Sequence, residues 1–349
     1  MKKIAFIAFE DNANVFTNWC SFINEHSKEY EARSFCIKEH PYQYTLEHNY
    51  NISTDSSKKK EEAKSWLLDC DYLIYSEEDQ TCYFEYSTAK TFKIILGINP
   101  IFETKAKKIA FYSGTAYRQK SQMFNQMDST CFDRVLSPLD LYRLTNKDSK
   151  TGCIFMCEKT KNPPETIKQM IIERFNQPSW LISHTPTNRQ IKGSDFLLKI
   201  MEKIQSESKN PIQYMEKSGL TPQESLDLKK KSCFYIDTLS IGLGILATGA
   251  HGVSSLESLS YGNIVFSSTY NMEQEAINRA SNPVLKQGVD YPINNLGQTI
   301  DSAYSKLNAV LNMSKDNLID LAIRSYQWYE NTSTPQKFVE KFIYEINQC

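Results

Sequence analysis

Short apolar runs alternate along the chain with stretches in which apolar residues recur every three to four positions. Such runs are typical of buried strands, and the 3.6-residue spacing is typical of amphipathic helices. In the first half the runs predict strands at Ile4–Phe9, Ala32–Ile37, Tyr72–Tyr75, Phe92–Leu96, Lys108–Tyr112 and Arg134–Leu136. The helical spacing predicts helices at Asn14–Glu25, Lys59–Leu68 and Tyr117–Met127. Strands alternating with helices indicate a parallel sheet with crossover helices.

A polar stretch with two prolines, Lys159–Glu165, interrupts this alternation and predicts a linker. Beyond it the same pattern restarts. The predicted strands are Trp180–His184, Ile212–Met215, Cys233–Ile236 and Asn263–Ser267. The predicted helices are Ser194–Ser206, Pro222–Lys230, Ser254–Tyr261, Gln298–Asn312, Lys315–Glu330 and Thr334–Asn347. We therefore expect an α/β protein of two Rossmann-like domains that face an inter-domain cleft, with ligands at the carboxyl ends of the strands.

Length and charge narrow the classes of function. The 349 residues suffice for two domains, which we place at 1–165 and 166–330. Forty Lys and Arg balance 41 Asp and Glu, so no overall field attracts nucleic acid, and we expect no nucleic-acid partner. The lysine clusters Lys58–Lys60, Lys105–Lys108 and Lys229–Lys231 are predicted to be solvated faces.

Cysteine usage and the apolar segments indicate a cytoplasmic protein. Nine cysteines are scattered without the spacing of a zinc site, so we expect reduced thiols and no metal. The apolar start of the chain reaches Glu10 too soon for a signal peptide. The uncharged run Thr238–Leu256 is broken by four glycines, which argues against a membrane span.

Motifs for several other chemistries are missing from the sequence. The run Gly242-Leu-Gly244 lacks the third glycine of a dinucleotide fingerprint because position 247 is Ala. No phosphate-binding loop, nucleophile elbow or His-Glu-x-x-His motif occurs. We therefore expect no bound cofactor. Asp237, at the end of a predicted strand, is interpreted as a turn former rather than a catalyst.

The segment from Gly249 to Phe266 combines a Gly-rich turn, a helix carrying one acid, a second glycine and a strand. The first N–H groups of a helix bind phosphate, and the helix begins near Gly252. The carboxylate of Glu257 can accept hydrogen bonds from ribose hydroxyls. This segment predicts a nucleotide-sugar site.

A second segment places cations at the head of another helix. The strand that ends in His184 is followed by a turn with Arg189 and Lys192, and then by the helix that begins at Ser194. Fixed cations stabilise the negative charge that develops when a nucleoside diphosphate departs from a sugar. A lone histidine at a strand end is more often structural than catalytic, so His184 is predicted to shape the turn and to touch the donor.

Both segments resemble the donor-binding signature of GT-B glycosyltransferases, above all the large retaining family 4. The resemblance implies a nucleotide-diphosphate sugar as co-substrate. Its sugar would be transferred without a metal and with retention of the anomeric configuration. Arg189 and Lys192 would act on the diphosphate. The implied donor-binding residues are His184, Gly252, Val253, Ser254, Ser255 and Glu257.

The resemblance extends more faintly into the N-terminal half, which would bind the acceptor. Ser113, Gly114 and Arg118 match a segment that faces the donor sugar in some family members, with Ser113 in place of a histidine. Asp11, Asn12 and Asn14 follow the first strand, where short polar side chains can bind a sugar hydroxyl or an acceptor, and Asn12 can equally well cap the next helix. His251 completes the residues expected at the sugar or acceptor.

The family resemblance also implies where the last helix packs and at which surface the protein acts. The last helix, within 331–349, would cross back to the N-terminal domain. Tyr326, Trp328 and Tyr329 either anchor that crossover or belong to the core of the second domain. The acceptor would be a glycan, a lipid-linked sugar or a protein, which leaves open a peripheral contact with the inner face of a membrane.

One departure from the family pattern leaves the type of reaction undecided. The first acid of the family's Glu-x7-Glu pair falls at position 249, which is Gly here, while Glu257 matches the second acid. Two alternatives therefore stand beside a glycosyltransferase. One is a GT-B epimerase acting on the nucleotide sugar, and the other is a non-catalytic partner of an active transferase.

Overall fold

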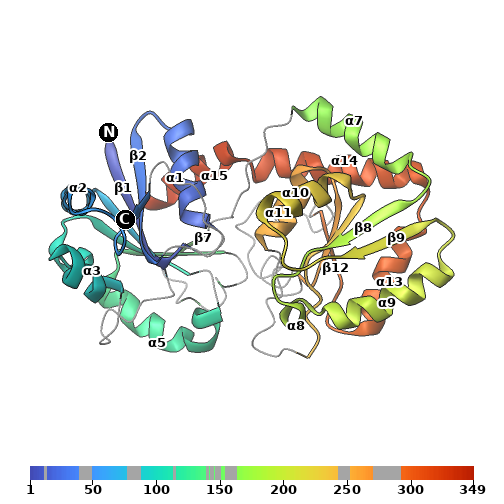
Figure 1. The fold of residues 1–349 in the computed structure, drawn as a ribbon, viewed down its shortest axis with the longest axis horizontal. Helices are drawn as coiled ribbons and strands as arrows, with labels where there is room; N and C mark the ends of the chain where they lie inside the picture. The colour runs from blue at the N-terminus through green and yellow to red at the C-terminus, as the bar shows by residue number, and fades with distance from the viewer. Residues whose placement is uncertain are drawn as a thin grey trace. The chain divides into compact units, whose positions relative to one another are not determined.

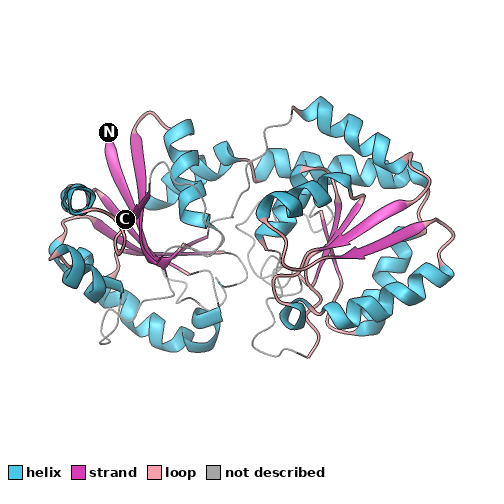
Figure 2. Ribbon diagram, viewed as in Figure 1, coloured by secondary structure: helices cyan, strands magenta, loops and turns pink. Residues whose placement is uncertain are grey.

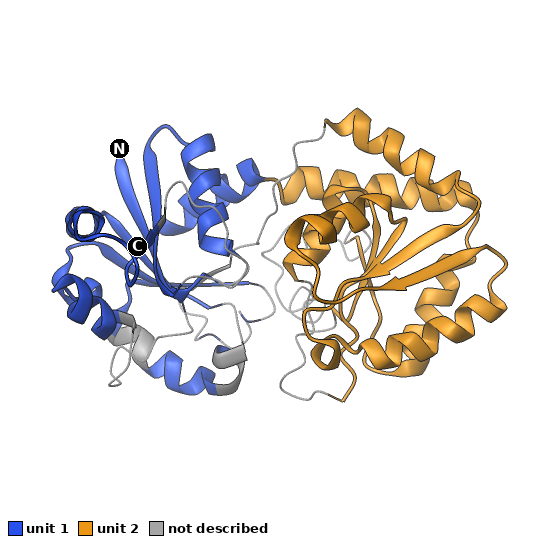
Figure 3. Ribbon diagram, viewed as in Figure 1, with its two compact units in different colours: residues 1–155, 335–349 blue, residues 156–334 orange. Residues whose placement is uncertain are grey.

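The computed structural model consists of two compact units, one formed by Met1–Phe155 with Pro335–Cys349 and the other by Met156–Thr334 (Figure 3). Both are α/β units built on a parallel sheet. The structure describes residues 1–11, 14–38, 49–76, 88–112, 115–138, 141, 145, 151–153, 163–242, 252–269 and 292–349, with some side chains left out inside the ordered elements.

Unit 1 contains a seven-stranded sheet in the order β3-β2-β1-β4-β5-β6-β7 (Figure 1). Every pairing in it is parallel. The strands are β1 Lys2–Glu10, β2 Tyr30–Lys38, β3 Asn49–Asn51, β4 Tyr72–Ser76, β5 Lys107–Phe111, β6 Arg134–Ser137 and β7 Thr151–Cys153. The helices are α1 Val15–His26, α2 Ser57–Leu68, α3 Thr88–Leu96, α4 Pro100–Glu103, α5 Thr115–Cys131 and, from the end of the chain, α15 Pro335–Ile346.

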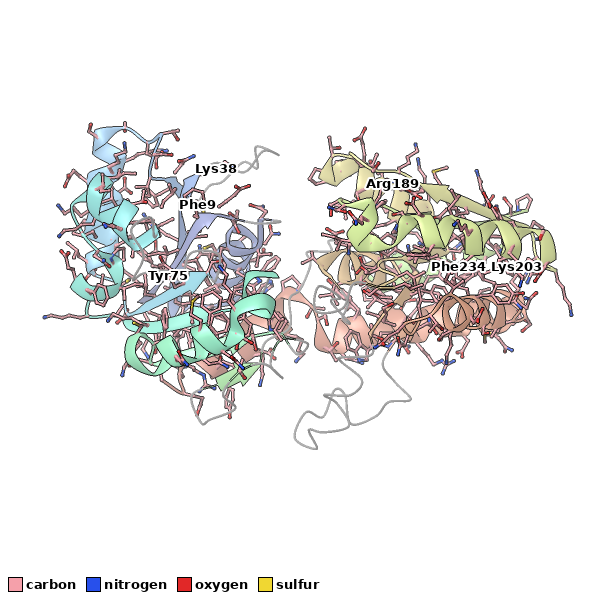
Figure 4. All side chains as sticks on the ribbon, turned by 90° about the horizontal axis from the view of Figure 1, so that it is seen from below. Phe9, Lys38, Tyr75, Arg189, Lys203 and Phe234 are labelled. Atoms are coloured by element: carbon pink, nitrogen blue, oxygen red, sulfur yellow. The ribbon has the colours of Figure 1, made fainter. Side chains whose placement is uncertain are left out.

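The middle of β1 is buried on both faces, as its continuous apolar run predicts for a central parallel strand. Its polar end emerges from the core, where Lys38 Nζ lies 3.0 Å from Glu10 Oε2. Figure 4 labels Lys38 close to Phe9 at the ends of β2 and β1.

Helix α15 is part of the core of unit 1. The Phe338 ring lies 4.7 Å from that of Trp19 on α1, and the Phe342 ring lies 5.6 Å from that of Phe6 on β1. A buried hydrogen bond of 2.5 Å joins Arg134 Nη2 to Glu345 Oε2. The last helix therefore completes the first unit, although the chain passes through the second unit before it.

One predicted strand is wrong. Residues 92–96 belong to helix α3, because Ala89, Phe92 and Leu96 are buried while Ile94 between them is 77% exposed. That spacing is helical, and a strand would have buried alternate residues. The short apolar run did not distinguish the two, since either element can bury such a run.

Unit 2 contains a parallel sheet of five strands in the order β12-β11-β10-β8-β9. Figure 2 draws the strands in magenta between the cyan helices. The strands are β8 Trp180–His184, β9 Ile212–Glu216, β10 Phe234–Ile236, β11 Ile264–Ser267 and β12 Ile293–Asn295. The helices are α7 Pro164–Phe175, α8 Arg189–Lys192, α9 Ser194–Glu207, α10 Pro222–Lys231, α11 Val253–Ser260, α13 Ile300–Leu311 and α14 Lys315–Thr332. Helix α14 packs against α7 and α11, whereas α13 packs against α9, and Figure 1 shows these two groups on opposite faces of the sheet.

The predicted helices at the end of the chain are confirmed as α13, α14 and α15. Tyr326, Trp328 and Tyr329 lie in the hydrophobic core of unit 2, among residues of α7 and α11. Of the two interpretations of these aromatics, the core of the second domain is therefore the one observed.

The strand order of unit 2 places a topological switch point between β8 and β10. The chain leaves β8 toward β9 on one side, then returns to β10 on the other. Crossover connections diverge at such a point and leave a crevice at the carboxyl ends of the strands, where ligands bind in open α/β sheets. Lys192 ends the short helix α8 that follows β8, and Asp237 directly follows β10.

Candidate functional site

Lys192 is held at the switch point by a glycine that follows it. Gly193 has a φ of +69°, and a Cβ at this position would lie 2.1 Å from the carbonyl oxygen of Leu239. The Leu239 N–H in turn donates to the Lys192 carbonyl at 3.1 Å. The loop after β10 therefore packs directly on the junction of α8 and α9, which only glycine permits.

The Lys192 ammonium pairs with a buried carboxylate. Its Nζ lies 2.5 Å from Asp237 Oδ1 and 2.8 Å from Thr238 Oγ1. The Asp237 side chain is 1% exposed, whereas that of Lys192 is 22% exposed. The pair therefore presents its positive end outward.

Asp237 also fixes the start of α11. Its Oδ2 accepts hydrogen bonds from the Gly252 N–H at 2.8 Å and from the Ser255 hydroxyl at 2.7 Å. Burial alone would raise the pKa of Asp237, but the Lys192 ammonium and these hydrogen bonds hold that pKa well below its ordinary value. Asp237 is more than the turn former predicted from the sequence, because it joins Lys192 to the helix.

The first turn of α11 keeps two donors available. Among the described residues, no partner accepts from the backbone N–H of Val253 or Ser254. A Cβ built on Gly252 would lie 3.9 Å from Lys192 Nζ, so this ammonium lies beside the start of the helix. An ammonium and unpaired helix N–H groups at one place form an anion site.

A second ion pair touches the same helix. Lys229, at the end of α10, is fully buried, and its Nζ contacts Glu257 Oε2 and donates to Ser254 Oγ at 2.7 Å. The Nζ also lies 5.2 Å from the centre of the Tyr235 ring. The prediction that Lys229 belongs to a solvated face is wrong, because Lys229 points into the unit while Lys231 is exposed.

His184 is buried and has no ring nitrogen left for a ligand. Its Nδ1 lies 2.8 Å from the Ile236 carbonyl and its Nε2 lies 2.8 Å from Ser194 Oγ. A carbonyl only accepts, so Nδ1 donates and Nε2 accepts from the serine. Burial lowers the pKa of His184 to about 4, which keeps the ring neutral near pH 7. The predicted contact of His184 with the donor is therefore wrong, because both ring nitrogens are paired inside the unit. Its predicted role in shaping the turn agrees with these contacts.

Arg189 lies in the short helix α8 and is already paired. Its guanidinium contacts Glu216 and donates to Asp195 Oδ1 at 2.7 Å. Figure 4 labels Arg189 on unit 2, together with the buried Phe234 of β10. Two carboxylates therefore compete with any diphosphate for this guanidinium.

The residues predicted in the first half are not assembled into a described site. Asn14 precedes α1 with a φ of 57°, and its side chain donates to Asn18 Oδ1 at 3.4 Å. Asp11 caps this helix instead, through the N–H groups of Phe16 and Thr17. Asn12, Ser113, Gly114 and His251 lie outside the described residues, as does the side chain of Arg118 on α5.

Two features are absent from the described residues, a metal site and a membrane-spanning helix. In the described ranges, no three His, Cys, Asp or Glu residues are grouped so that they could hold a metal ion. None of the described helices is both long enough and apolar enough to cross a membrane.

The sequence matches no protein-family model, and no curated protein matches it. Solved structures share its fold at low identity. Anabaena Alr3699/HepE in complex with UDP has a TM-score of 0.56 and 8% identity over 100% of both chains. A candidate UDP-N-acetylglucosamine 2-epimerase from Listeria monocytogenes has a TM-score of 0.53 and 11% identity, covering 99% of this chain and 96% of that one. The catalytic domain of Arabidopsis thaliana starch synthase IV, bound to ADP and acarbose, has a TM-score of 0.50 and 9% identity over 99% of both chains.

These likenesses establish the fold and support the α/β class predicted from the sequence. The chain has the GT-B fold, with two Rossmann-like units each built on a parallel sheet, and it shares this fold with structures that hold UDP or ADP.

Proposed function

We propose that this protein binds the diphosphate of a nucleotide sugar at the start of α11 and transfers the sugar to an acceptor. The observation that carries the proposal is the position of Lys192 Nζ beside Gly252, next to the N–H groups of Val253 and Ser254, for which no described residue is a partner. Asp237 holds both parts of this arrangement, so the donors are in place before a ligand arrives.

Preorganised donors of this kind favour departure of a nucleoside diphosphate. Negative charge develops on the diphosphate as the bond to the sugar breaks, and a fixed ammonium with helix N–H groups stabilises it there. The protein then supplies position and charge rather than a nucleophile, and the proposal requires no metal. Retention of configuration and an acceptor that is a glycan, a lipid-linked sugar or a protein are parts of the same proposal.

The nucleotide ribose is proposed to meet Glu257, about one turn further along α11. Side chains on a helix lean toward its N-terminus, so the Glu257 carboxylate leans toward the diphosphate site. Ser255 contributes indirectly, because its hydroxyl is committed to Asp237.

A nucleotide-sugar epimerase is the second candidate. It is favoured by the likeness to the Listeria protein and by Gly249, which takes the place of the acid that contacts the sugar in the resembling transferases. An epimerase would use the same diphosphate site while returning the altered sugar to the same nucleotide.

Incubation with UDP- and ADP-linked sugars separates these functions. We expect nucleoside diphosphate to be released in the presence of an acceptor extract, which supports the transferase. An altered sugar that leaves no separate diphosphate product supports the epimerase. Failure of every donor to bind, by calorimetry, contradicts both and leaves the non-catalytic partner.

The contribution of Lys192 is measured with Lys192→Met against a matched control. Lys199→Met removes an exposed lysine from α9 of the same unit. We expect Lys192→Met to lower turnover by about 100-fold or more, as does the loss of one oxyanion donor. Lys199→Met should keep wild-type turnover. Wild-type turnover in folded Lys192→Met would overturn the proposed role.

A further inference from the structure

The burial of Lys229 calls for an explanation beyond stability. Its side chain is 1% exposed, although it belongs to a run of three lysines at the end of a surface helix. Desolvating an ammonium costs several kcal/mol, and an apolar residue of the same volume usually serves stability as well. The burial of a lysine in this position therefore points to a role for its charge.

The backbone of α10 fixes where this lysine can reach. Thr221 and Glu224 form a capping box at the start of the helix. At its end, the side-chain amide of Asn263 fixes the backbone. Its Nδ2 donates to the Lys229 carbonyl at 3.0 Å, and its Oδ1 accepts from Arg174 Nη1 at 2.8 Å. The stem of Lys229 consequently runs inward toward α11.

Its ammonium reaches the carboxylate proposed to bind ribose. Lys229 Nζ contacts Glu257 Oε2, and Ser254 Oγ, which accepts from the same ammonium, also lies 2.8 Å from Tyr235 OH. The Glu257 side chain is 22% exposed, and no described residue donates to its Oε1. One oxygen is thus held inside the unit, and the other is available to a ligand.

We infer that Lys229 is a positioning residue that fixes Glu257 for recognition of the nucleotide ribose. The inference rests on the proposed nucleotide site and extends it by one residue, which does not itself touch the ligand. Fixing the carboxylate in one rotamer removes the cost of ordering it when a ribose hydroxyl donates to Oε1. Lys229 therefore acts on affinity for ribose and not on affinity for the diphosphate.

The test compares UDP and ADP with their 2′,3′-dideoxy forms by calorimetry. The wild type should bind the ribonucleotide about tenfold or more tightly than the dideoxy form, as expected for hydrogen bonds to a charged acceptor. In Lys229→Met and in Glu257→Gln this ratio should fall to about one to three, because the carboxylate is no longer held or no longer present. The exposed neighbour provides the control, since Lys231→Met should keep the wild-type ratio.

The outcomes separate this inference from the proposed function. A wild-type ratio that survives in Lys229→Met overturns the inference and leaves the nucleotide site standing. A wild type that binds both forms equally also overturns it, since Glu257 then does not recognise ribose. A wild type that binds neither nucleotide overturns the site and the inference together.

A double variant keeps the test valid if a single substitution impairs folding. Lys229→Met combined with Glu257→Gln removes both charges of the pair, so neither is left buried without its partner. If Lys229 acts only through Glu257, this double variant binds UDP as tightly as Glu257→Gln alone. A further loss of affinity of about tenfold in the double variant would show that Lys229 acts on the ligand by another route.

Discussion

The two lysine–carboxylate pairs that touch the first turns of α11 are built in opposite senses. In one pair Asp237 is 1% exposed and Lys192 is 22% exposed. In the other Lys229 is 1% exposed and Glu257 is 22% exposed. The first pair presents a cation to its surroundings and the second presents an anion.

This difference matches the two chemical parts of a nucleoside diphosphate. An outward ammonium beside free helix N–H groups suits the phosphates, and an outward carboxylate suits the hydroxyls of a sugar. In each pair the buried partner holds the outward one in place. Burial of one ion can thus serve the position of another, and the buried residues support the proposed site from behind the outward ones.

The largest expected effect is on stability, and it depends on which of the two outward residues, Glu257 or Lys192, is removed. Glu257→Leu should lower the free energy of unfolding by about 3 to 5 kcal/mol, because it leaves the Lys229 ammonium buried with one hydrogen bond, to Ser254. Lys192→Met should cost only about 1 to 3 kcal/mol, since Asp237 keeps its bonds from Gly252 and Ser255. Urea unfolding of the two variants measures this difference.

Equal losses of stability in the two variants would show that the hydrogen bonds left to the buried ion do not set the cost of removing its partner. Glu257→Gln serves as the control. Its amide oxygen can still accept from Lys229, so it should be more stable than Glu257→Leu.

As the pH falls, His184 should be protonated before the Asp237 carboxylate that pairs with Lys192. His184 has a pKa of about 4 when folded, against about 6.5 when unfolded, so its contribution to stability is complete above about pH 6.5 and is lost as the pH falls toward 4. The loss should be about 3 kcal/mol. The depressed pKa of Asp237 keeps that carboxylate charged throughout this interval.

Unfolding at about pH 7 and about pH 4 in the wild type and in His184→Gln isolates this effect. The difference between the two pH values should be smaller in the variant. An unchanged difference would show that other groups cause the acid sensitivity.

A substitution at Gly193 should disturb one pair and spare the other. Gly193→Ala places a Cβ against the Leu239 carbonyl and forces alanine into a left-handed conformation, at a cost of about 2 kcal/mol or more. Because Lys192 is its neighbour, affinity for UDP should fall about tenfold. The ratio between UDP and its dideoxy form should stay at the wild-type value, since Lys229 and Glu257 lie on other elements. A changed ratio would show that the two pairs are coupled.

The smallest effect is expected at Arg189, which the family resemblance placed beside Lys192 in catalysis. Its side chain is 46% exposed and paired with two carboxylates, so Arg189→Ala should change stability by less than about 1 kcal/mol. We expect a smaller loss of UDP affinity than in Lys192→Met. A larger loss would show that Arg189 exchanges its carboxylate partners for the diphosphate.

The order of elements in both units follows from local sequence patterns. Long periodic stretches such as Lys315–Thr332 form helices as predicted, because their apolar stripe is visible within the segment. The strand predicted at 92–96 failed, since a short apolar run fits a helix equally well until its neighbours are known. The edge strands β3, β7 and β12 have three residues each and gave no sequence signal.

The candidate site was predictable where its residues are close in sequence. The helix after Gly252 and the cation at Lys192 both have local motifs. Lys229 looked like part of a solvated cluster, because nothing in a run of three lysines distinguishes the one that points inward. His184 was predicted to shape the turn and to touch the donor, and only its contacts with Ile236 and Ser194 show that both ring nitrogens are already paired.

Local sequence patterns are enough to predict two α/β units with parallel sheets, a helix start suited to phosphate and a cation ahead of another helix. The folded structure adds that Asp237 links Lys192 to α11, that Lys229 contacts Glu257, and that the last helix completes the first unit. The physical reason is the range of the interactions. Periodicity and helix termini act over a few residues, whereas the partners of a buried charge come from strands and helices that the chain brings together from distant positions.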